Sequence, residues 1–112
     1  MRIRHYIAIA VQKCRIFYLQ FFGYNIDISC EVERGINLDR LNRSGITIGK
    51  RTIVASRVTI LSHKIKIDTV TNKTSGVFYD TKIGDHCIIG VGTIIMPGVT
   101  IGDRVVVGAG SV

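Results

Sequence analysis

A six-residue repeat in the C-terminal third of the chain constrains the fold more than any other sequence feature. Counting from Ile83, an aliphatic residue returns every six positions, at Ile83, Ile89, Ile95, Ile101 and Val107. Four positions after each of them comes a small or β-branched residue: Cys87, Thr93, Val99, Val105 and Ser111. A β-meander would instead show alternation with a period of two and clusters of turn residues. A sustained period of six is a signature of the parallel β-helix.

In such a coil each hexad forms one short strand and one bend, and three hexads complete a triangular turn. We expect the aliphatic residue to point inward and the glycine beside it to provide a tight or positive-φ backbone at the corner. Stacked turns pair through their backbones and bury a ladder of aliphatic side chains. The predicted class is therefore all-β. Its handedness does not follow from the spacing, because right-handed crossovers are the general rule.

The same register is present earlier in the chain, with two interruptions. The aliphatic positions before the second interruption are Ile26, Val32, Leu38, Ile48, Val54 and Ile60. We interpret residues 39–47 as an irregular side with a short loop, and residues 61–82 as a long excursion without a sustained hexad. Such an excursion is either disordered or functional. We therefore divide the chain into an N-terminal helix (1–23) and a β-helix (24–112) that contains the excursion loop (61–82).

The N-terminal segment is predicted to be an amphipathic helix, because its apolar residues recur three and four positions apart. They are Ile3, Tyr6, Ile7, Ala10, Cys14, Phe17, Tyr18 and Phe21. Lys13 and Arg15 at its centre argue against a membrane-spanning helix. We expect the helix, ending near Gly23, to cover the open N-terminal end of the coil or to pack beside it, because such an end exposes apolar surface and unpaired strand edges. A basic amphipathic helix lying on a membrane surface is the alternative.

Charge and cysteine content limit the partners and the compartment. The 112 residues carry a net charge of +7, which suggests a polyanionic partner such as coenzyme phosphates, nucleic acid or an anionic membrane. The bases are dispersed and no nucleic-acid-binding motif accompanies them, so we expect no nucleic-acid partner. Cys14, Cys30 and Cys87 are an odd number without metal-type spacing, which favours a reducing compartment. Cys30 and Cys87 fall on interior positions, where they would act as small apolar filler.

The run Ile83-Gly-Asp-His-Cys-Ile-Ile-Gly-Val-Gly, together with Met96-Pro-Gly-Val99 and Val107-Gly-Ala-Gly-Ser, resembles the C-terminal coils of the hexapeptide-repeat acyltransferases. Within that family it is most similar to the sugar O-acetyltransferases of the maltose, galactoside and surface-polysaccharide type. The resemblance covers about residues 24–112. It implies a left-handed parallel β-helix, a homotrimer and acetyl-coenzyme A as donor, while the cysteines favour the cytoplasm as the compartment. It also implies that the excursion loop reaches toward the adjacent subunit and walls the acceptor pocket.

His63 matches the histidine that serves as catalytic base in this family. An imidazole can take the proton of a sugar hydroxyl near neutral pH as the oxygen attacks a thioester, without a covalent intermediate. Asp68, in the same loop, is one candidate for orienting the imidazole; a backbone carbonyl is another, and Asp68 could also be an ordinary solvated carboxylate. Asn37 matches an asparagine that faces the acceptor pocket, or is a corner residue suited to positive φ.

Four further residues match the family's donor-binding positions. The resemblance implies that Val91, Gly92, Ala109 and Gly110 contact the donor in a groove between subunits. The donor phosphates would need cations, and the sequence does not choose among the coil bases Lys50, Arg51, Arg57, Lys82 and Arg104. A zinc site like that of the hexapeptide-repeat carbonic anhydrases needs three histidines. The coil portion contains only His63 and His86, so no metal site is expected.

Taken together, the sequence predicts an enzyme that moves an acetyl group from acetyl-coenzyme A to a hydroxyl of a saccharide. Acetylation of an amino sugar and a non-catalytic scaffold or assembly subunit remain the alternatives. A peripheral contact of the N-terminal helix with the inner membrane also stays open. Family members continue past the position of Val112 with a basic, proline-containing segment, so we expect the coil to be truncated there and the donor site to be weakened.

Overall fold

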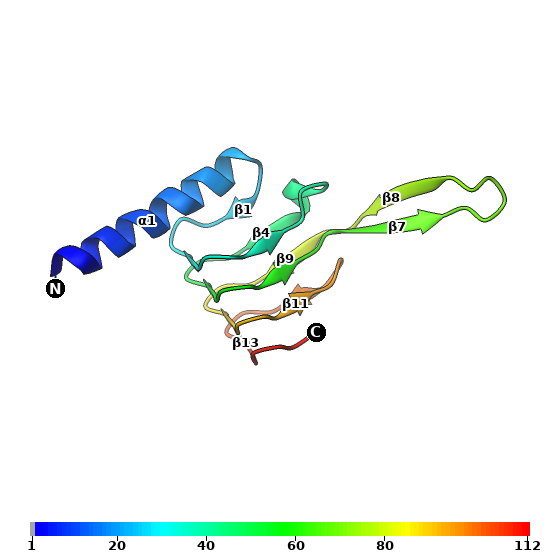
Figure 1. Cartoon of the computed structure of the whole chain (residues 1–112). Helices are drawn as coiled ribbons and strands as arrows, with labels where there is room; N and C mark the ends of the chain where they lie inside the picture. Colours follow the sequence, from blue (N-terminus) through cyan, green and yellow to red (C-terminus); the bar gives the residue numbers. More distant parts are fainter. Residues whose placement is uncertain (1) are drawn as a thin grey trace.

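The computed structural model describes residues 2–112 and consists of one helix followed by a stack of triangular coils (Figure 1). Helix α1 spans Arg2–Phe21. The first coil contains β1 (Asn25–Ile26), β2 (Glu31–Val32) and β3 (Asn37–Leu38). After a short 3-10 helix, η1 (Arg43–Gly45), the second coil contains β4 (Ile46–Ile48), β5 (Ile53–Val54) and β6 (Thr59–Ile60). The third contains β9 (Thr81–Ile83), β10 (Ile88–Ile89) and β11 (Ile94–Ile95), and the last contains β12 (Thr100–Ile101) and β13 (Val106–Val107).

Strands of successive coils pair in parallel and form the three faces of the stack. The strand orders are β1-β4-β9-β12, β2-β5-β10-β13 and β3-β6-β11. The register places interior residues directly beside one another, for example Ile48 beside Ile83 and Val54 beside Ile89. The buried aliphatic ladder that the hexads predict is therefore confirmed.

The second interior position is buried in most hexads of the first three coils, whereas Ile36 is half-buried and Val99 is exposed. Cys30, Thr52, Val58, Cys87 and Thr93 are all buried there. The polar members bond to the backbone of the next coil: the Thr52 hydroxyl donates to the Gly84 carbonyl at 2.7 Å, and the Cys87 thiol to the Gly102 carbonyl at 3.0 Å. Small side chains that can donate to a carbonyl thus fill a position too narrow for larger ones.

Three of the glycines that follow interior aliphatic residues, Gly49, Gly84 and Gly90, are required for space between coils. A Cβ on Gly84 would lie 2.8 Å from the carbonyl carbon of Gly102, and one on Gly90 would lie 2.5 Å from the backbone nitrogen of Ala109. Positive φ occurs two residues later, at Gly92, where φ is 73° and the Thr93 N–H donates to the Gly90 carbonyl at 3.3 Å. That arrangement suits a type II turn. The expected positive φ therefore lies at the second glycine and not at the first.

Helix α1 ends as predicted. Gly23 has a φ of 102°, its N–H donates to the Gln20 carbonyl at 3.0 Å, and the Tyr24 N–H donates to the Leu19 carbonyl at 3.2 Å. These two bonds are those of a Schellman motif, in which a left-handed glycine turns the chain out of a helix. The turn directs the chain into β1.

The helix packs on the edge of the first coil, and its polar side faces that edge. Ile16 is fully buried against the coil and Leu19 packs beside it, and polar side chains of the helix bond to the coil backbone. Lys13 and Gln20 donate to the Ile28 and Ile26 carbonyls at 2.5 and 2.7 Å. The physical reason is that the edge of the first coil presents unpaired backbone groups, which need hydrogen-bond partners more than apolar cover. The apolar face therefore points to solvent.

The excursion 61–82 is an ordered antiparallel hairpin that projects from the stack (Figure 1). Its strands are β7 (His63–Ile67) and β8 (Thr74–Phe78), with His63 paired to Phe78 at the base. The sequence contains a signal for strand β7, because lysine alternates with isoleucine along His63-Lys-Ile-Lys-Ile67 and a period of two is typical of a half-exposed strand. Among residues 2–112, no helix combines the length and hydrophobicity that a membrane crossing needs.

The requirement for space between coils is testable with two matched glycines. Gly84→Ala is expected to lower the free energy of unfolding by about 1–3 kcal/mol, because the added methyl group meets backbone of the next coil. Gly102→Ala is the control, since a Cβ there meets no atom within 4 Å. Urea unfolding measures both, and equal effects of the two substitutions would contradict this account.

Candidate active site

His63 and Asp39 meet at the base of the hairpin. Strands β3 and β6 are neighbours, with Leu38 paired to Ile60, so the residues that follow the two strands come together at one edge of the face. The Nδ1 atom of His63 is hydrogen-bonded to Oδ2 of Asp39. The Asp39 side chain is 1% exposed and that of His63 is 24% exposed. The imidazole is therefore anchored on its buried side and open on the other.

The bond to Asp39 selects the tautomer of His63. An ionised carboxylate can only accept hydrogen bonds, so the proton must be on Nδ1 of the neutral ring. The other ring nitrogen, Nε2, then carries a free lone pair. Such an imidazole can accept a proton at Nε2 while the carboxylate stabilises the resulting charge.

The Asp39 carboxylate is surrounded by donors. Oδ1 accepts the N–H groups of Leu41 and Asn42 at 2.9 and 3.3 Å, and Oδ2 accepts the Ser62 N–H at 2.9 Å as well as the His63 ring. Burial by itself would raise the pKa of this carboxyl, but the bonds from Ser62, His63, Leu41 and Asn42 together lower the pKa below its ordinary value of 3.8. Asp39 is thus held ionised, as the tautomer argument requires.

Asn42 ties the two ends of the hairpin to the coil. Its amide nitrogen donates to the carbonyls of Ser62 and Tyr79 at 2.9 and 3.4 Å, while the Ser62 hydroxyl donates to the Asn42 carbonyl at 2.7 Å. The Tyr24 hydroxyl adds a bond of 2.8 Å to the Asp39 carbonyl. Gly45 leaves room for the Asn42 amide, which a Cβ would strike. The irregular segment 39–47 is therefore the support of the site.

Asp68 lies at the tip of the hairpin, away from His63. Its carboxylate accepts the Val70 N–H at 2.9 Å, and its own N–H donates to the Lys73 carbonyl at 2.8 Å. Five residues of extended strand separate it from His63, which is about 16 Å. Within the chain, Asp39 and not Asp68 contacts the His63 ring, and a role for Asp68 stays a prediction. The sequence contains one indication of Asp39. The six-residue repeat is interrupted directly after Leu38, at Asp39, and Leu38 has the same position in its coil as Ile60, which shortly precedes His63.

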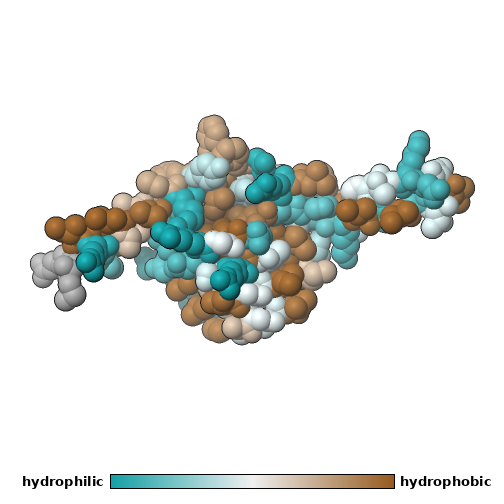
Figure 2. Space-filling view, in the orientation of Figure 1, coloured by the Kyte–Doolittle hydropathy of each residue, from teal (hydrophilic) through white to brown (hydrophobic). Residues whose placement is uncertain are grey.

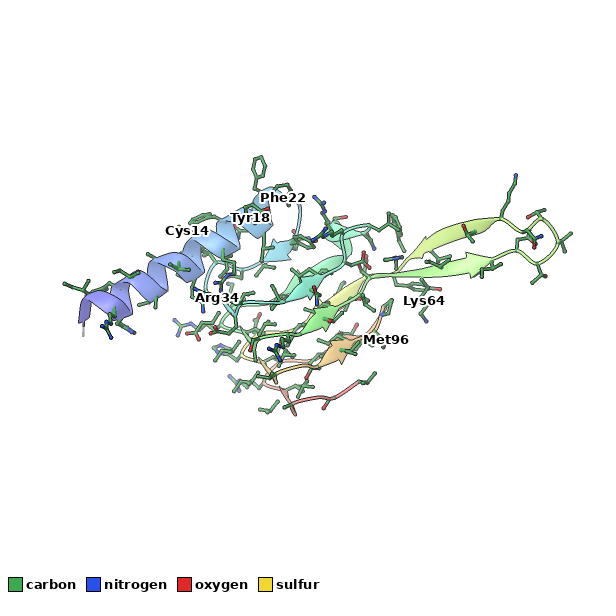
Figure 3. The ribbon with its side chains drawn as sticks, viewed as in Figure 1. Cys14, Tyr18, Phe22, Arg34, Lys64 and Met96 are labelled. Atoms are coloured by element: carbon green, nitrogen blue, oxygen red, sulfur yellow. The ribbon has the colours of Figure 1, made fainter. Side chains whose placement is uncertain are left out.

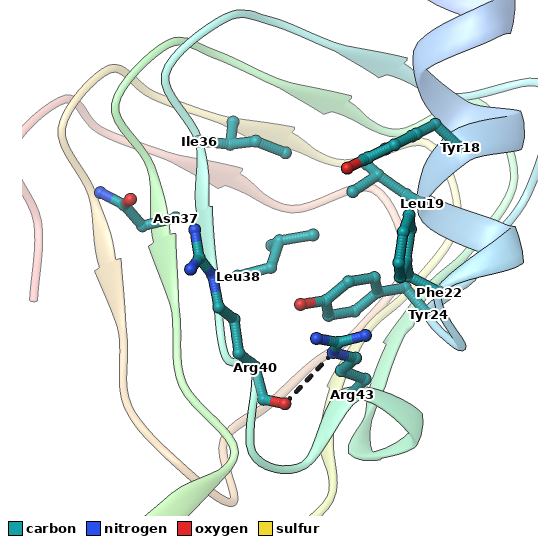
Figure 4. Close-up of a pocket in the computed structure, with 9 residues that line it drawn as sticks. All are labelled: Tyr18, Leu19, Phe22, Tyr24, Ile36, Asn37, Leu38, Arg40 and Arg43. Carbon is teal, nitrogen blue, oxygen red and sulfur yellow. Dashed lines mark hydrogen bonds between the residues drawn. The ribbon is translucent and has the colours of Figure 1, made fainter.

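Asn37 is a strand residue and not a corner residue. It lines a hollow of about 360 Å³ between the end of α1 and β3 (Figure 4), together with Tyr18, Leu19, Phe22, Tyr24, Ile36, Leu38, Arg40 and Arg43. His63 does not line this hollow. Asn37 precedes Asp39 by two residues, or about 7 Å of strand. Its contact with an acceptor stays a prediction.

The four residues predicted to meet the donor form a column at one corner of the stack. Val91 and Gly92 make the corner of the third coil, Ala109 and Gly110 that of the last, and the Gly110 N–H donates to the Val91 carbonyl at 2.8 Å. A Cβ on Gly92 or Gly110 would meet no atom within 4 Å, so the column is open on its outside. Their contact with the donor stays a prediction.

One of the coil bases belongs to the same column. Arg57 occupies the equivalent corner of the second coil, and the neighbouring Ser56 carbonyl accepts the Gly92 N–H at 3.1 Å. Arg51 and Arg104 occupy a different corner, where the chain passes from the first face to the second. Position therefore favours Arg57 among the bases that the sequence could not separate. Among the described residues no cluster of His, Cys, Asp and Glu suits a metal ion.

Comparison with known proteins agrees with the sequence resemblance. Residues 80–112 match the bacterial transferase hexapeptide (six repeats) family. The chain is 36% identical over 93 residues to a galactoside O-acetyltransferase of Escherichia coli (strain K12), an alignment that covers 81% of this chain and 45% of the relative. It is 32% identical over 103 residues to a galactoside O-acetyltransferase of Lactococcus lactis, with 85% and 46% covered.

The fold has a solved counterpart as well. The crystal structure of a maltose O-acetyltransferase from Clostridium difficile 630 aligns with a TM-score of 0.63 and 28% identity, covering 86% of this chain and 62% of that one. The predicted left-handed parallel β-helix is thereby confirmed. The chain spans a little less than half the length of the two galactoside O-acetyltransferases.

The Asp39 network predicts a pH-dependent stability. Asp39→Asn is expected to lower the free energy of unfolding by about 1–3 kcal/mol near neutral pH, because the amide leaves buried donors unsatisfied. The folded-state pKa of Asp39 lies below 3.8, so its contribution is present above that pH and is lost as the pH falls through the folded-state pKa. Urea unfolding at several pH values should show the variant and the unaltered protein converging in acid.

Asp68→Asn is the matched control, because its carboxylate is exposed at the hairpin tip. It should change the free energy of unfolding less than Asp39→Asn at neutral pH. A difference for Asp39→Asn that stays constant from neutral to acid pH would show that the carboxylate charge does not stabilise the site.

Proposed function

Because the chain belongs to the hexapeptide-repeat transferases, we propose that it transfers an acetyl group from acetyl-coenzyme A to a hydroxyl group of a saccharide. The observation that carries the proposal is the Asp39–His63 pair, which engages Nδ1 and leaves Nε2 available on a side chain that is 24% exposed. The similarity to galactoside and maltose O-acetyltransferases supports the acyl donor and the class of acceptor.

In the proposed reaction His63 acts as a general base. Its Nε2 takes the hydroxyl proton while the acceptor oxygen attacks the thioester carbonyl carbon, so that a C–O bond forms as the C–S bond breaks. The imidazolium then returns the proton to the departing coenzyme thiolate, and no covalent enzyme intermediate is needed. Asp39 holds the ring by Nδ1–H and offsets the positive charge that appears on it. Asn42 and Ser62 keep Asp39 and the hairpin base in place.

A homotrimer is part of the proposal. Apolar side chains are exposed on the outside of the third and last coils, here called the lower coils. They lie on both sides of the Val91–Gly92 corner: Ile88, Val91, Ile94, Met96 and Val106. Exposed apolar patches of this kind mark interaction surfaces. An interface there would close the open side of the corner column into a groove for the donor. The hairpin, with Lys64 near its base (Figure 3) and its amine 5.2 Å from the centre of the Tyr79 ring, would extend toward the neighbouring subunit.

The compartment follows from the cysteines. Cys14, Cys30 and Cys87 are all free, which supports a reducing environment such as the cytoplasm. The phosphates of the donor would be met by Arg57, the base in the corner column. The free thiols support the compartment, and the corner position of Arg57 supports its contact with the phosphates.

Sedimentation equilibrium tests the oligomeric state. A trimer should sediment with three times the chain mass of 12.4 kDa, which is about 37 kDa. The physical reason is the apolar outer surface of the lower coils, which is too extended for an isolated solenoid. A species of the chain mass at micromolar concentration would contradict the proposed assembly.

The catalytic prediction is tested by thiol release from acetyl-coenzyme A with a panel of mono- and disaccharides. His63→Asn should lower kcat about 100- to 10,000-fold, because it removes the general base. The rise in melting temperature caused by coenzyme A should persist, since the substitution leaves the donor site intact. Asp39→Asn should lower kcat to a smaller extent.

His86→Asn is the matched control, because His86 is an exposed coil histidine with a φ of 55° that asparagine tolerates. It should retain full activity. Faster release with amino sugars than with neutral sugars would move the acceptor from a hydroxyl to an amine. Absence of both release and a thermal shift would refute the enzyme and favour a scaffold.

A further inference from the structure

We propose that helix α1 docks the protein on an anionic lipid bilayer, with its outward apolar face in the headgroup region. This face, here called the outer stripe, consists of Ile3, Ile7, Ala10, Cys14, Phe17, Tyr18 and Phe21. Their spacing of three and four places them on one side of the helix. Ile3, Ile7, Phe17 and Phe21 are 73%, 57%, 61% and 85% exposed. Hydrophobic side chains run along the part of α1 that faces away from the coils (Figure 2).

The orientation of the helix is held by specific bonds. Gln12 accepts the Val32 N–H at 2.9 Å, Lys13 and Gln20 donate to coil carbonyls, and Arg15 donates to the Val32 carbonyl. Ile16 is fully buried beneath them. Turning the outer stripe toward the coil would break all of these bonds and leave coil carbonyls unpaired. The stripe is therefore a fixed outer surface, with Cys14 on the side of α1 away from the stack (Figure 3) and Tyr18 at its edge, where it also lines the hollow beside β3.

The charges around the stripe favour an anionic surface. The 20 residues of α1 contain no Asp or Glu, and Arg4 is exposed, whereas Lys13 and Arg15 are directed to the coil. Lys13 and Arg15 donate to main-chain carbonyls of the coil, where Asp27 and Glu33 are also near, so the positive charge on the open side of the helix comes from Arg4. At the C-terminal end, the Arg43 guanidinium lies 5.4 Å from the centre of the Phe22 ring. Each basic residue near an anionic bilayer contributes about 1 kcal/mol of attraction.

The shape of the outer stripe favours a bilayer as its partner rather than a protein. A 20-residue helix is about 30 Å long and its outer side is convex. The N-terminal half of α1 extends beyond the coils (Figure 1), so the stripe forms a straight ridge and not a groove. A ridge with aromatic and aliphatic residues between cations fits the headgroup boundary, where amphipathic helices lie flat at a depth of about 5–10 Å. Tyrosine at its edge also suits that boundary.

The test is co-sedimentation of the full chain with sucrose-loaded vesicles. Vesicles of phosphatidylcholine with about a third of phosphatidylglycerol should bind the protein, and vesicles of phosphatidylcholine alone should bind it much less. The double variant Ile7→Glu with Phe21→Glu should lower the apparent partition coefficient at least about tenfold, because it removes two apolar contacts and adds two negative charges. Added salt should weaken the binding.

The hairpin provides a matched control. Ile65 and Ile67 are each 67% exposed and lie on β7, away from α1. The double variant Ile65→Glu with Ile67→Glu should bind vesicles nearly as the unaltered protein does. Circular dichroism and the melting temperature should be unchanged in both double variants, because all four side chains are exposed.

Three outcomes would overturn the proposal: no binding to the anionic vesicles, equal loss of binding in the two double variants, or a change of oligomeric mass caused by Ile7→Glu with Phe21→Glu. The last result would mean that a second copy of the chain covers the outer stripe. Vesicle binding and thiol release are separate measurements. The docking surface can therefore fail without affecting the proposed acetyl transfer, and the reverse also holds.

Discussion

The rest of the site depends on the hydrogen bonds that the Asp39 carboxylate accepts. It accepts backbone N–H groups from the irregular segment and from Ser62, and it also holds the ring of His63. One buried charge thus bends the chain out of the repeat, ties the hairpin base to the first two coils and sets the tautomer of the histidine. Burying a carboxylate costs free energy unless hydrogen-bond donors surround it. Here the donors belong to the irregular segment, to the base of the hairpin and to His63 itself.

The coil supplies a rigid frame with repeated positions on it. Parallel pairing in register places equivalent residues of successive coils directly above one another, so that one sequence motif becomes a column in space. The column of Arg57, Gly92 and Gly110 is an example, since these residues lie at the same corner of three coils. Interior glycines such as Gly84 allow the coils to approach, because a side chain there would strike the next backbone. The stacking of the coils therefore positions both the column of corner residues and the Asp39–His63 pair.

The N-terminal helix shows how an unpaired edge changes the meaning of an amphipathic pattern. The first coil offers carbonyls and N–H groups that no strand pairs, and the polar side of α1 satisfies them through Gln12, Lys13, Arg15 and Gln20. The apolar side is left facing outward. Backbone hydrogen bonding therefore outweighed apolar burial at this contact, and the exposed surface becomes available for another partner.

The sequence by itself determined the repeat, the interior positions, the helix with its end at Gly23 and the location of His63, because each of these depends on local spacing or backbone preference. The tertiary structure decided what pairs with His63, which side of α1 meets the coil and that residues 63–78 form a hairpin. Asp39 lies 24 residues from His63 in the chain, and only the stacking of β3 on β6 brings them together. Asp68, nearer in sequence, is carried away because an extended strand separates neighbours quickly.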